Sequence, residues 1–350
     1  MKKLLLLFAA MLLCSLAHSQ EAEGNGSYAD FQLIPRFDFN PYFTPGDKSD
    51  GSSGHTFGNS SIYTLIEGAF GEHVSFTLNN HWMTVPTSDW GDTKALYEGT
   101  LYSNTNNWVD IAKVDLTFGN WQISLGKDCM ATGGFEYDAW DVDTDFLINS
   151  EGNIMLASNL WSNLPSYQWG AGVGYNIADH TNLTLQMLTS PFGERPFASK
   201  LFVYSFKWTG NYGPFSNIWS ATMAPRADGA TEWLIALSQQ AELGDFTVGL
   251  DWYNVADVDY DDDDAPCGFI HGNTFRPRLA YAPTEEFECG LYANIYNLAG
   301  APLSDFNIGA SVHYRPIETI QLHAAAGWDW TTNCVSALAG IKVNFHFLSL

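Results

Sequence analysis

Hydrophobic and polar residues alternate with a period of two along most of the chain. In residues 112–118 every second side chain is apolar, and after Gly119-Asn120 the same alternation resumes in residues 121–126. A tight Gly-Asn turn between two such runs predicts a β-hairpin. Because the pattern recurs down the chain, we expect an all-β protein.

The composition of the two faces predicts where this sheet lies. Aromatic residues stand at both ends of the apolar rows, while small, polar or charged residues occupy the opposite rows. An apolar outer face with aromatic ends and a polar inner face is typical of membrane barrels. We therefore predict a transmembrane antiparallel β-barrel with lipid outside and water inside.

About sixteen strands can be placed on this pattern. Short turns follow the even-numbered strands and longer loops follow the odd ones, which is the asymmetry of periplasmic turns and external loops. Fourteen or eighteen strands remain open. A barrel of roughly sixteen strands encloses an aqueous channel, whereas about eight strands would fill their own interior. The predicted strands are residues 29–40, 61–70, 74–83, the two halves of the hairpin, 166–175, 182–190, 201–208, 215–224, 231–240, 246–254, 275–282, 286–297, 305–314, 319–328 and 335–347.

The third long loop, residues 129–163, is the main candidate for a functional segment. It is rich in carboxylates and contains no Lys or Arg. A segment of this length without elements of its own is usually functional or disordered. It can be a solvated external loop, or it can fold into the lumen and narrow the pore. The acids of this predicted constriction loop are Glu136, Asp138, Asp141, Asp143, Asp145 and Glu151.

Basic residues in inward rows would face such a loop across the lumen. Carboxylates opposite a cationic wall set a transverse field that sorts solutes by charge and dipole. Acids share the same wall, and the acidic excess lies in the loops, so we expect a weakly selective pore whose mouth attracts cations. The predicted wall residues are Arg36, Lys113, Lys207, Arg276, Arg278 and Lys342, with Glu67, Asp115, Glu232, Asp251 and Glu288 among them.

The N-terminus predicts export. Two lysines precede an apolar run, and residues 17–19 offer small side chains at both cleavage positions, so residues 1–19 are interpreted as a signal peptide and the mature barrel as residues 20–350. No later run reaches the roughly 20 apolar residues of a membrane helix. A membrane protein made from this chain must therefore be a closed barrel, and we expect it in a bacterial outer membrane.

The charge balance excludes nucleic acid as a partner. Loss of the signal peptide lowers the number of basic residues from 15 to 13 against 39 acids, a net charge near −26. Such a chain repels the phosphate backbone. The partners we expect are outer-membrane lipid, small hydrophilic solutes and ions.

Metal, cofactor and enzyme chemistry have little support. The acidic run at residues 257–264 offers a weak calcium site, but it lacks the Gly and Glu that a calcium loop places at its sixth and twelfth positions. Inward histidines such as His313 and His323 are most often polar lining, so we expect no enzymatic activity and no cofactor. The weak metal candidates are Asp259, Asp261, Asp262 and Asp263.

The cysteines allow two interpretations. Cys129, Cys267 and Cys334 lie in segments placed on one side of the membrane, where an oxidised pair can form. Cys289 falls in an outward row and is expected to be a free thiol.

Two short motifs resemble a known family. Gly126-Lys127-Asp128 followed by the Gly-Gly-Phe-Glu-Tyr-Asp stretch at residues 133–138 is similar to the porin-like outer-membrane barrels of Bacteroidota, and Leu-Thr-Ser-Pro-Phe at residues 188–192 looks like another part of that pattern. These barrels are distantly similar to phosphate-selective porins. The resemblance implies an outer-membrane channel that can be a homotrimer. The basic ladder of a phosphate pore is not evident in this chain.

The sequence therefore favours a passive porin for ions and small hydrophilic solutes, weakly cation-preferring. Two alternatives stay open, namely a non-conducting barrel that serves as a structural or surface-interaction module, and an anion- or phosphate-selective porin.

Overall fold

The computed structural model describes residues 27–45, 52–57, 60–86, 93–95, 109–138, 146–193, 200–260, 266–298 and 305–349. In these ranges the chain forms a closed antiparallel barrel of 16 strands. The predicted fold class is confirmed. The predicted signal peptide lies outside the described residues.

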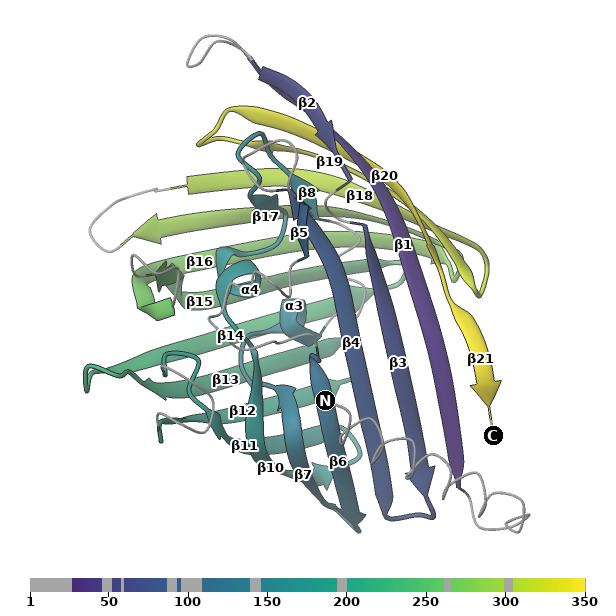
Figure 1. The fold of residues 1–350 in the computed structure, drawn as a ribbon, viewed down its shortest axis with the longest axis vertical. Helices are drawn as coiled ribbons and strands as arrows, with labels where there is room; N and C mark the ends of the chain where they lie inside the picture. The colour runs from purple at the N-terminus through teal and green to yellow at the C-terminus, as the bar shows by residue number, and fades with distance from the viewer. Residues whose placement is uncertain are drawn as a thin grey trace.

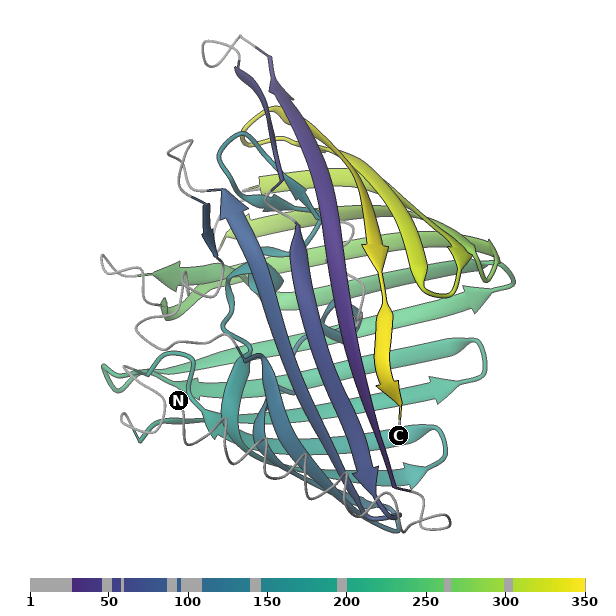
Figure 2. The same cartoon turned by 45° about the vertical axis from the view of Figure 1, so that its right-hand side comes forward.

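Each wall strand pairs with its neighbours in the chain, and the first strand closes the ring. Arg36 of β1 pairs with Ser61 of β3 on one side and with Lys342 of β20 on the other. Figures 1 and 2 show β1 lying beside β20 and β21, so the two ends of the chain meet in one sheet. A closed ring leaves no edge strand with unpaired backbone groups, which is what the interior of a bilayer requires.

Four strands lie outside the simple ring of hairpins, and one wall strand is interrupted. β2 extends the first loop beside the upper end of β1, β5 pairs with the end of β4, and β8 and β9 form a small sheet of their own. The last wall strand is interrupted at Asn344, whose backbone N–H still donates to the carbonyl of Thr319 at 2.8 Å, so β20 and β21 together form that strand. The wall strands are β1 (Tyr28–Thr44), β3 (Ser61–Phe70), β4 (Val74–Pro86), β6 (Ile111–Phe118), β7 (Trp121–Cys129), β10 (Tyr167–Ala178), β11 (Thr181–Thr189), β12 (Phe202–Tyr212), β13 (Phe215–Pro225), β14 (Thr231–Leu243), β15 (Phe246–Tyr260), β16 (Pro266–Thr284), β17 (Phe287–Leu298), β18 (Asp305–Ile317), β19 (Ile320–Asp329), β20 (Cys334–Val343) and β21 (Phe345–Ser349). The others are β2 (Ser52–Thr56), β5 (Thr93–Ala95), β8 (Leu147–Ile148) and β9 (Ile154–Met155).

Alternation along the strands separates an apolar outside from an inside that is buried or polar. On β14, Trp233 and Leu237 are 50% and 42% exposed on the outer surface, while Leu234 and Ala236 between them are fully buried. Exposed aromatic and aliphatic side chains would be costly in water but are stable against lipid. The buried apolar residues on the inner face require something inside the barrel to cover them.

The short turns on one side of the barrel were predictable from glycine. Gly71, Gly119, Gly213 and Gly244 lie in the turns that follow β3, β6, β12 and β14, and each has a positive φ between 57° and 66°. Glycine adopts this conformation without the steric cost that a Cβ brings. The turns fall within the predicted turn stretches, although β12 and β14 continue to Tyr212 and Leu243, past their predicted ends at residues 208 and 240.

The strands extend farther than predicted on the side of the long loops. β15 continues past the predicted end at residue 254 to Tyr260, and β16 begins at Pro266 instead of residue 275. Register shifts between Tyr253 and Val255 interrupt the period of two while the backbone pairing continues. The predicted strands were therefore too short, because the alternation of apolar and polar side chains ends before the backbone hydrogen bonding does.

The described parts of the loop of residues 129–163, which are residues 129–138 and 146–163, turn back into the barrel. We call this loop the inner loop. It contains α3 (Phe135–Asp138), the β8–β9 hairpin and α4 (Asn159–Asn163). Figure 1 shows α3 and α4 within the ring of strands. Hydrogen bonds join the loop to strands far apart in the sequence, for example between Ile148 and Asn40 of β1. The described parts of the loop therefore contact inner-row residues of the wall, and the narrowing of a pore by this loop stays a prediction.

Within the described ranges, no helix is both long and apolar enough to span a membrane. Within those ranges, Cys129, Cys289 and Cys334 are free thiols.

Candidate functional site

An apolar cluster holds the middle of the inner loop to the wall. Leu147, Met155 and Leu156 of the loop are fully buried against Ala325 of β19 and Leu338 of β20. Apolar contacts of this kind exclude water and stabilise the docked loop in proportion to the area they bury. This part of the loop is therefore packed as firmly as a protein core.

Two glycines of the wall make room for these side chains. A Cβ at Gly309 of β18 would lie 2.8 Å from the side chain of Leu156, and one at Gly327 of β19 would lie 2.9 Å from that of Leu147. Real Cβ contacts are longer, so a larger residue at either position would clash with the loop, and at Gly309 it would also meet the carbonyl oxygen of Ala326 at 2.5 Å. The small residues of the inner rows thus serve to seat the loop.

A second apolar cluster holds the two ends of the inner loop. Met130 and Leu160 come from the loop and Leu164 directly follows it, while their partners come from several neighbouring strands and from the segment after β11. The cluster explains why inward residues of β14 are apolar. The partners are Leu188, Phe192, Val203, Ala224, Leu234, Ala236, Tyr253, Val255, Val258 and Phe269.

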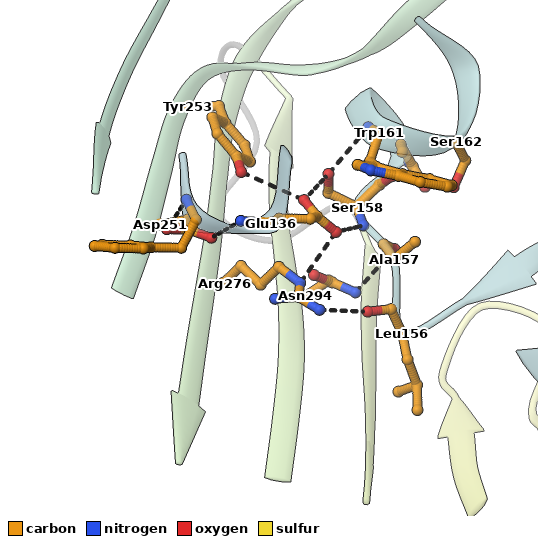
Figure 3. Close-up of polar contacts among 12 residues, drawn as sticks. Glu136, Leu156, Ala157, Ser158, Trp161, Ser162, Asp251, Tyr253, Arg276 and Asn294 are labelled. Carbon is orange, nitrogen blue, oxygen red and sulfur yellow. Dashed lines mark hydrogen bonds and ion pairs between the residues drawn. The ribbon is translucent and has the colours of Figure 1, made fainter. Parts of the chain in front are cut away.

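Glu136 of α3 is the centre of a buried polar network (Figure 3). Its Oε1 lies 3.1 Å from Nε of Arg276 and accepts a hydrogen bond of 2.7 Å from the backbone N–H of Ser158. Its Oε2 accepts from the hydroxyls of Ser158 at 2.6 Å and Tyr253 at 3.3 Å. Both members of the ion pair are at most 2% exposed. A buried charge of this kind is tolerated when it is paired and its remaining lone pairs are satisfied.

The backbone around Glu136 is also fixed to the wall. The carboxylate of Asp251 on β15 accepts from the N–H groups of Phe135 at 3.3 Å and Glu136 at 3.2 Å. On β13, the Ser220 hydroxyl donates to the carbonyl of Gly133 at 3.0 Å. Side chains of the barrel therefore satisfy backbone groups that have no partner within so short a helix.

Further side chains of the wall bind carbonyl groups in the second half of the loop. Arg276 donates from Nη2 to the carbonyl of Leu156 at 3.0 Å, and Asn294 of β17 donates to that of Ala157 at 3.0 Å. Arg276 thus joins both halves of the inner loop, because it also pairs with Glu136.

The tip of the β8–β9 hairpin reaches the strands that close the barrel. The amide of Asn40 donates to the carbonyl of Ile148 at 3.0 Å and accepts from its N–H at 2.7 Å. Ser336 of β20 donates to the same carbonyl at 2.8 Å. The inner loop is consequently anchored along an arc that runs from β13 round to β1.

A different ion pair lies at the more exposed end of α3. Asp138 of the loop pairs with Lys207 of β12. The side chain of Asp138 is 40% exposed and that of Lys207 15% exposed. This pair joins the predicted loop acids to the predicted basic wall while part of its charge remains accessible.

A third charged group lies on β6 and β7. The ammonium of Lys113 is 3.2 Å from a carboxylate oxygen of Asp128 and 3.8 Å from one of Asp115. Two carboxylates around one ammonium leave a net negative charge. The lysine that the sequence assigned to a cationic wall is thus surrounded by acids.

Arg36 and Lys342 adjoin each other where β1 meets β20. Nε of Arg36 is 3.1 Å from a carboxylate oxygen of Asp38, whose other oxygen is 2.7 Å from Nε2 of His323. Asp38 and His323 meet across Gly340, where a Cβ would come within 2.0 Å of the carboxylate. The absence of a side chain on the middle strand lets residues two strands apart interact.

The remaining predicted residues are more scattered. Glu151 lies exposed in the turn between β8 and β9, and the loop acids at positions 141, 143 and 145 lie outside the described residues. Asp259 accepts a hydrogen bond from the thiol of Cys267 at 3.0 Å, while positions 261–263 are not described. In the ranges that the structure covers, no three His, Cys, Asp or Glu side chains gather as a metal would require.

Sequence reasoning did not identify several anchoring residues. Ser158 caps α4 by accepting from the N–H of Trp161, and this Ser before a short helix was a readable signal. Asn40 and Asn294 occupy inward rows, which was also readable. Their partners lie more than a hundred residues away, and no local pattern shows such distances.

Comparisons with known proteins agree with this geometry. A mutant of the Rh. blastica porin matches with a TM-score of 0.58 and 15% identity, covering 91% of this chain and 100% of the other. Salmonella typhi OmpF, in a complex with daunomycin, matches with a TM-score of 0.62 and 11% identity, covering 92% and 98%. A loop-deletion mutant of Vibrio cholerae OmpT has a TM-score of 0.56 and 11% identity, covering 91% and 100%. Identities this low show a shared barrel fold.

No protein-family model matches the chain, and no curated protein matches it either.

Proposed function

We propose that this chain is an outer-membrane porin through which ions and small hydrophilic solutes diffuse passively. The observation that carries the proposal is a closed barrel of 16 strands whose inner loop is fastened to the wall from β13 round to β1. A barrel of this size encloses an aqueous channel. A loop held to one side narrows such a channel and gives it a size limit. The likeness to solved porin structures supports the same function.

Selectivity would come from charges that remain accessible in the lumen. Glu136 and Arg276 neutralise each other and are buried, so they contribute little. Asp138 is the more exposed member of its pair with Lys207. Together with the acidic pair around Lys113 and the acidic loops, this favours a weak preference for cations. Of the loop acids and basic wall residues named from the sequence, we therefore propose that only the accessible ones influence which ions pass.

Liposome swelling tests the channel proposal. Vesicles that contain the folded barrel should swell in iso-osmotic arabinose and glucose, and more slowly in a trisaccharide. Vesicles without protein serve as the control. A barrel that is folded but gives no swelling with any sugar would support the non-conducting alternative.

The folded barrel inserted into a planar bilayer tests ion preference. In a gradient of potassium chloride, the sign of the reversal potential should show that potassium passes modestly more easily than chloride. A preference for chloride or phosphate would instead favour the anion-selective alternative.

We also propose that copies of the chain associate as a homotrimer. The support for this is the resemblance to porin-like barrels, which implies an outer-membrane channel that can be a homotrimer. The mass of the barrel in detergent, measured by light scattering, tests it. Three times the mass of one chain would support the trimer, and the mass of a single chain would contradict it.

Relationship and export complete the proposal. The Gly-Gly-Phe-Glu-Tyr-Asp stretch, which resembles that of Bacteroidota porin-like barrels, coincides with the segment that anchors the inner loop, from Gly133 to Glu136. This supports a common ancestry with those barrels and, more distantly, with phosphate-selective porins. Removal of residues 1–19 on export would be seen as a mature N-terminus at Gln20 in the mass of the purified protein.

A further inference from the structure

Arg278 lies on the inner face of β16, two residues from Arg276 and in register with Gly249 of β15 and Tyr292 of β17. A Cβ at Gly249 would come within 2.6 Å of Nε and 3.0 Å of Cγ of Arg278. The arginine side chain therefore lies across the neighbouring strand, in space that only a glycine leaves open.

An aromatic ring of the inner loop fixes the other side of this arginine. The guanidinium carbon of Arg278 is 5.0 Å from the centroid of the Phe135 ring. Stacking on an aromatic face holds the planar guanidinium and leaves the N–H groups at its edge free to donate. Phe135 is itself positioned by its backbone hydrogen bond to Asp251.

The two neighbouring arginines differ in what they bind. Arg276 is fully buried, pairs with Glu136 and donates to the carbonyl of Leu156. Arg278 is half-buried, and among the described residues its guanidinium makes no hydrogen bond and no ion pair. Of these two arginines, only Arg278 has donors available for a solute.

Among the described residues, no carboxylate forms an ion pair with Arg278. Asp251 and Glu288 act on it through space. The carboxylate of Asp251 already accepts from the backbone N–H groups of Phe135 and Glu136. A guanidinium that is oriented but unpaired is suited to bind a planar or tetrahedral oxyanion through two parallel hydrogen bonds.

We propose that Arg278, positioned by Phe135, is a binding subsite in the lumen for a small oxyanion, either a carboxylate or a phosphate group of a passing solute. The proposal rests on the proposed function, since solutes must reach the lumen. It makes the barrel a weakly cation-preferring channel that nevertheless retains particular anions.

Calorimetric titration of the full folded barrel in detergent tests the subsite. The probes are succinate for a carboxylate and inorganic phosphate for a phosphate group. Arg278→Gln should weaken binding at least tenfold, and Arg278→Lys by roughly threefold, because an ammonium keeps the charge but not the planar fork. Phe135→Leu should weaken binding by a similar amount to Arg278→Lys, since it removes the ring that orients the guanidinium.

Arg315→Gln is the matched control, because it removes the same charge near the turn that follows β18, where Arg315 donates to Gln321. It should change affinity less than twofold. Heat-dependent migration in gels verifies that each variant is folded. Equal binding by wild type and Arg278→Gln, or no binding of either anion by wild type, would overturn the subsite.

Conductance separates this failure from failure of the proposed function. A barrel that conducts potassium chloride but binds neither anion is a porin without the subsite. A barrel that binds succinate through Arg278 but shows no conductance has the subsite without the channel.

Discussion

Two acidic residues of α3 have different roles because their side chains are buried to different extents. Glu136 and Asp138 lie two positions apart on α3 and both pair with a basic residue of the wall. Glu136 is 1% exposed and joins the loop to the barrel, whereas the side chain of Asp138 is 40% exposed. The sequence grouped them as constriction acids. Because Glu136 is buried, we interpret it as an anchor of the loop. Asp138 is accessible and can act on solutes.

Glu136→Gln should loosen the inner loop. The change leaves the Arg276 guanidinium buried without its counter-ion, a loss that typically costs about 3–5 kcal/mol. Limited proteolysis of the folded barrel should then cut within residues 129–163 at least tenfold faster. Asp138→Asn is the matched control, because an exposed pair contributes about 0–1 kcal/mol. Equal protection of the loop in wild type and Glu136→Gln would contradict the anchoring role.

Asp138→Asn should instead alter ion preference. It leaves the Lys207 ammonium without its partner, so the local charge in the lumen becomes more positive. The reversal potential in a potassium chloride gradient should shift toward chloride. Glu318→Gln, a charge loss in the turn between β18 and β19, should leave it unchanged. If both variants shift it equally, then Asp138 has no special place in the pathway.

At the scale of elements, the inner loop behaves as part of the wall. Its apolar side chains are buried as deeply as a protein core, and its backbone binds side chains from β13 round to β1. Turns and most strand bounds followed from local patterns, and β3 was predicted residue for residue. The docking of the loop did not, because Ile148 finds its partner Ser336 at a sequence separation of 188.

Gly134→Ala tests how closely the loop fits. A Cβ at Gly134 would lie 1.7 Å from the Ser238 hydroxyl oxygen and 2.6 Å from its Cβ, so the loop must move. Overpacking of this kind costs about 1–3 kcal/mol. We expect faster proteolysis of the loop and larger, noisier conductance steps.

Gly174→Ala is the control for that substitution. It lies on the inner face of β10, where a new Cβ would have its nearest neighbour at an ordinary 3.6 Å. It should leave both readouts unchanged. A Gly134→Ala barrel that behaves like Gly174→Ala would show that the loop is not tightly seated.

At the scale of the whole molecule, closure was the most predictable feature. An even number of two-faced strands, with short turns on one side, permits only a closed ring in a membrane, and pairing of β1 with β20 provides it. The position of the inner loop inside the barrel was not predictable. The space that seats Leu147 and Leu156 of the loop is left by Gly309 and Gly327 in inner rows, and this effect appears only when the strands are in register.

Single-channel recording in a planar bilayer tests the central claim most directly, namely that the barrel is a water-filled channel narrowed by its inner loop. We expect stable conductance steps for the wild type and larger steps after deletion of residues 133–151, because the deletion removes α3 and the β8 side of the hairpin from the lumen. A folded barrel that gives no steps, or a deletion that leaves their size unchanged, would contradict the account.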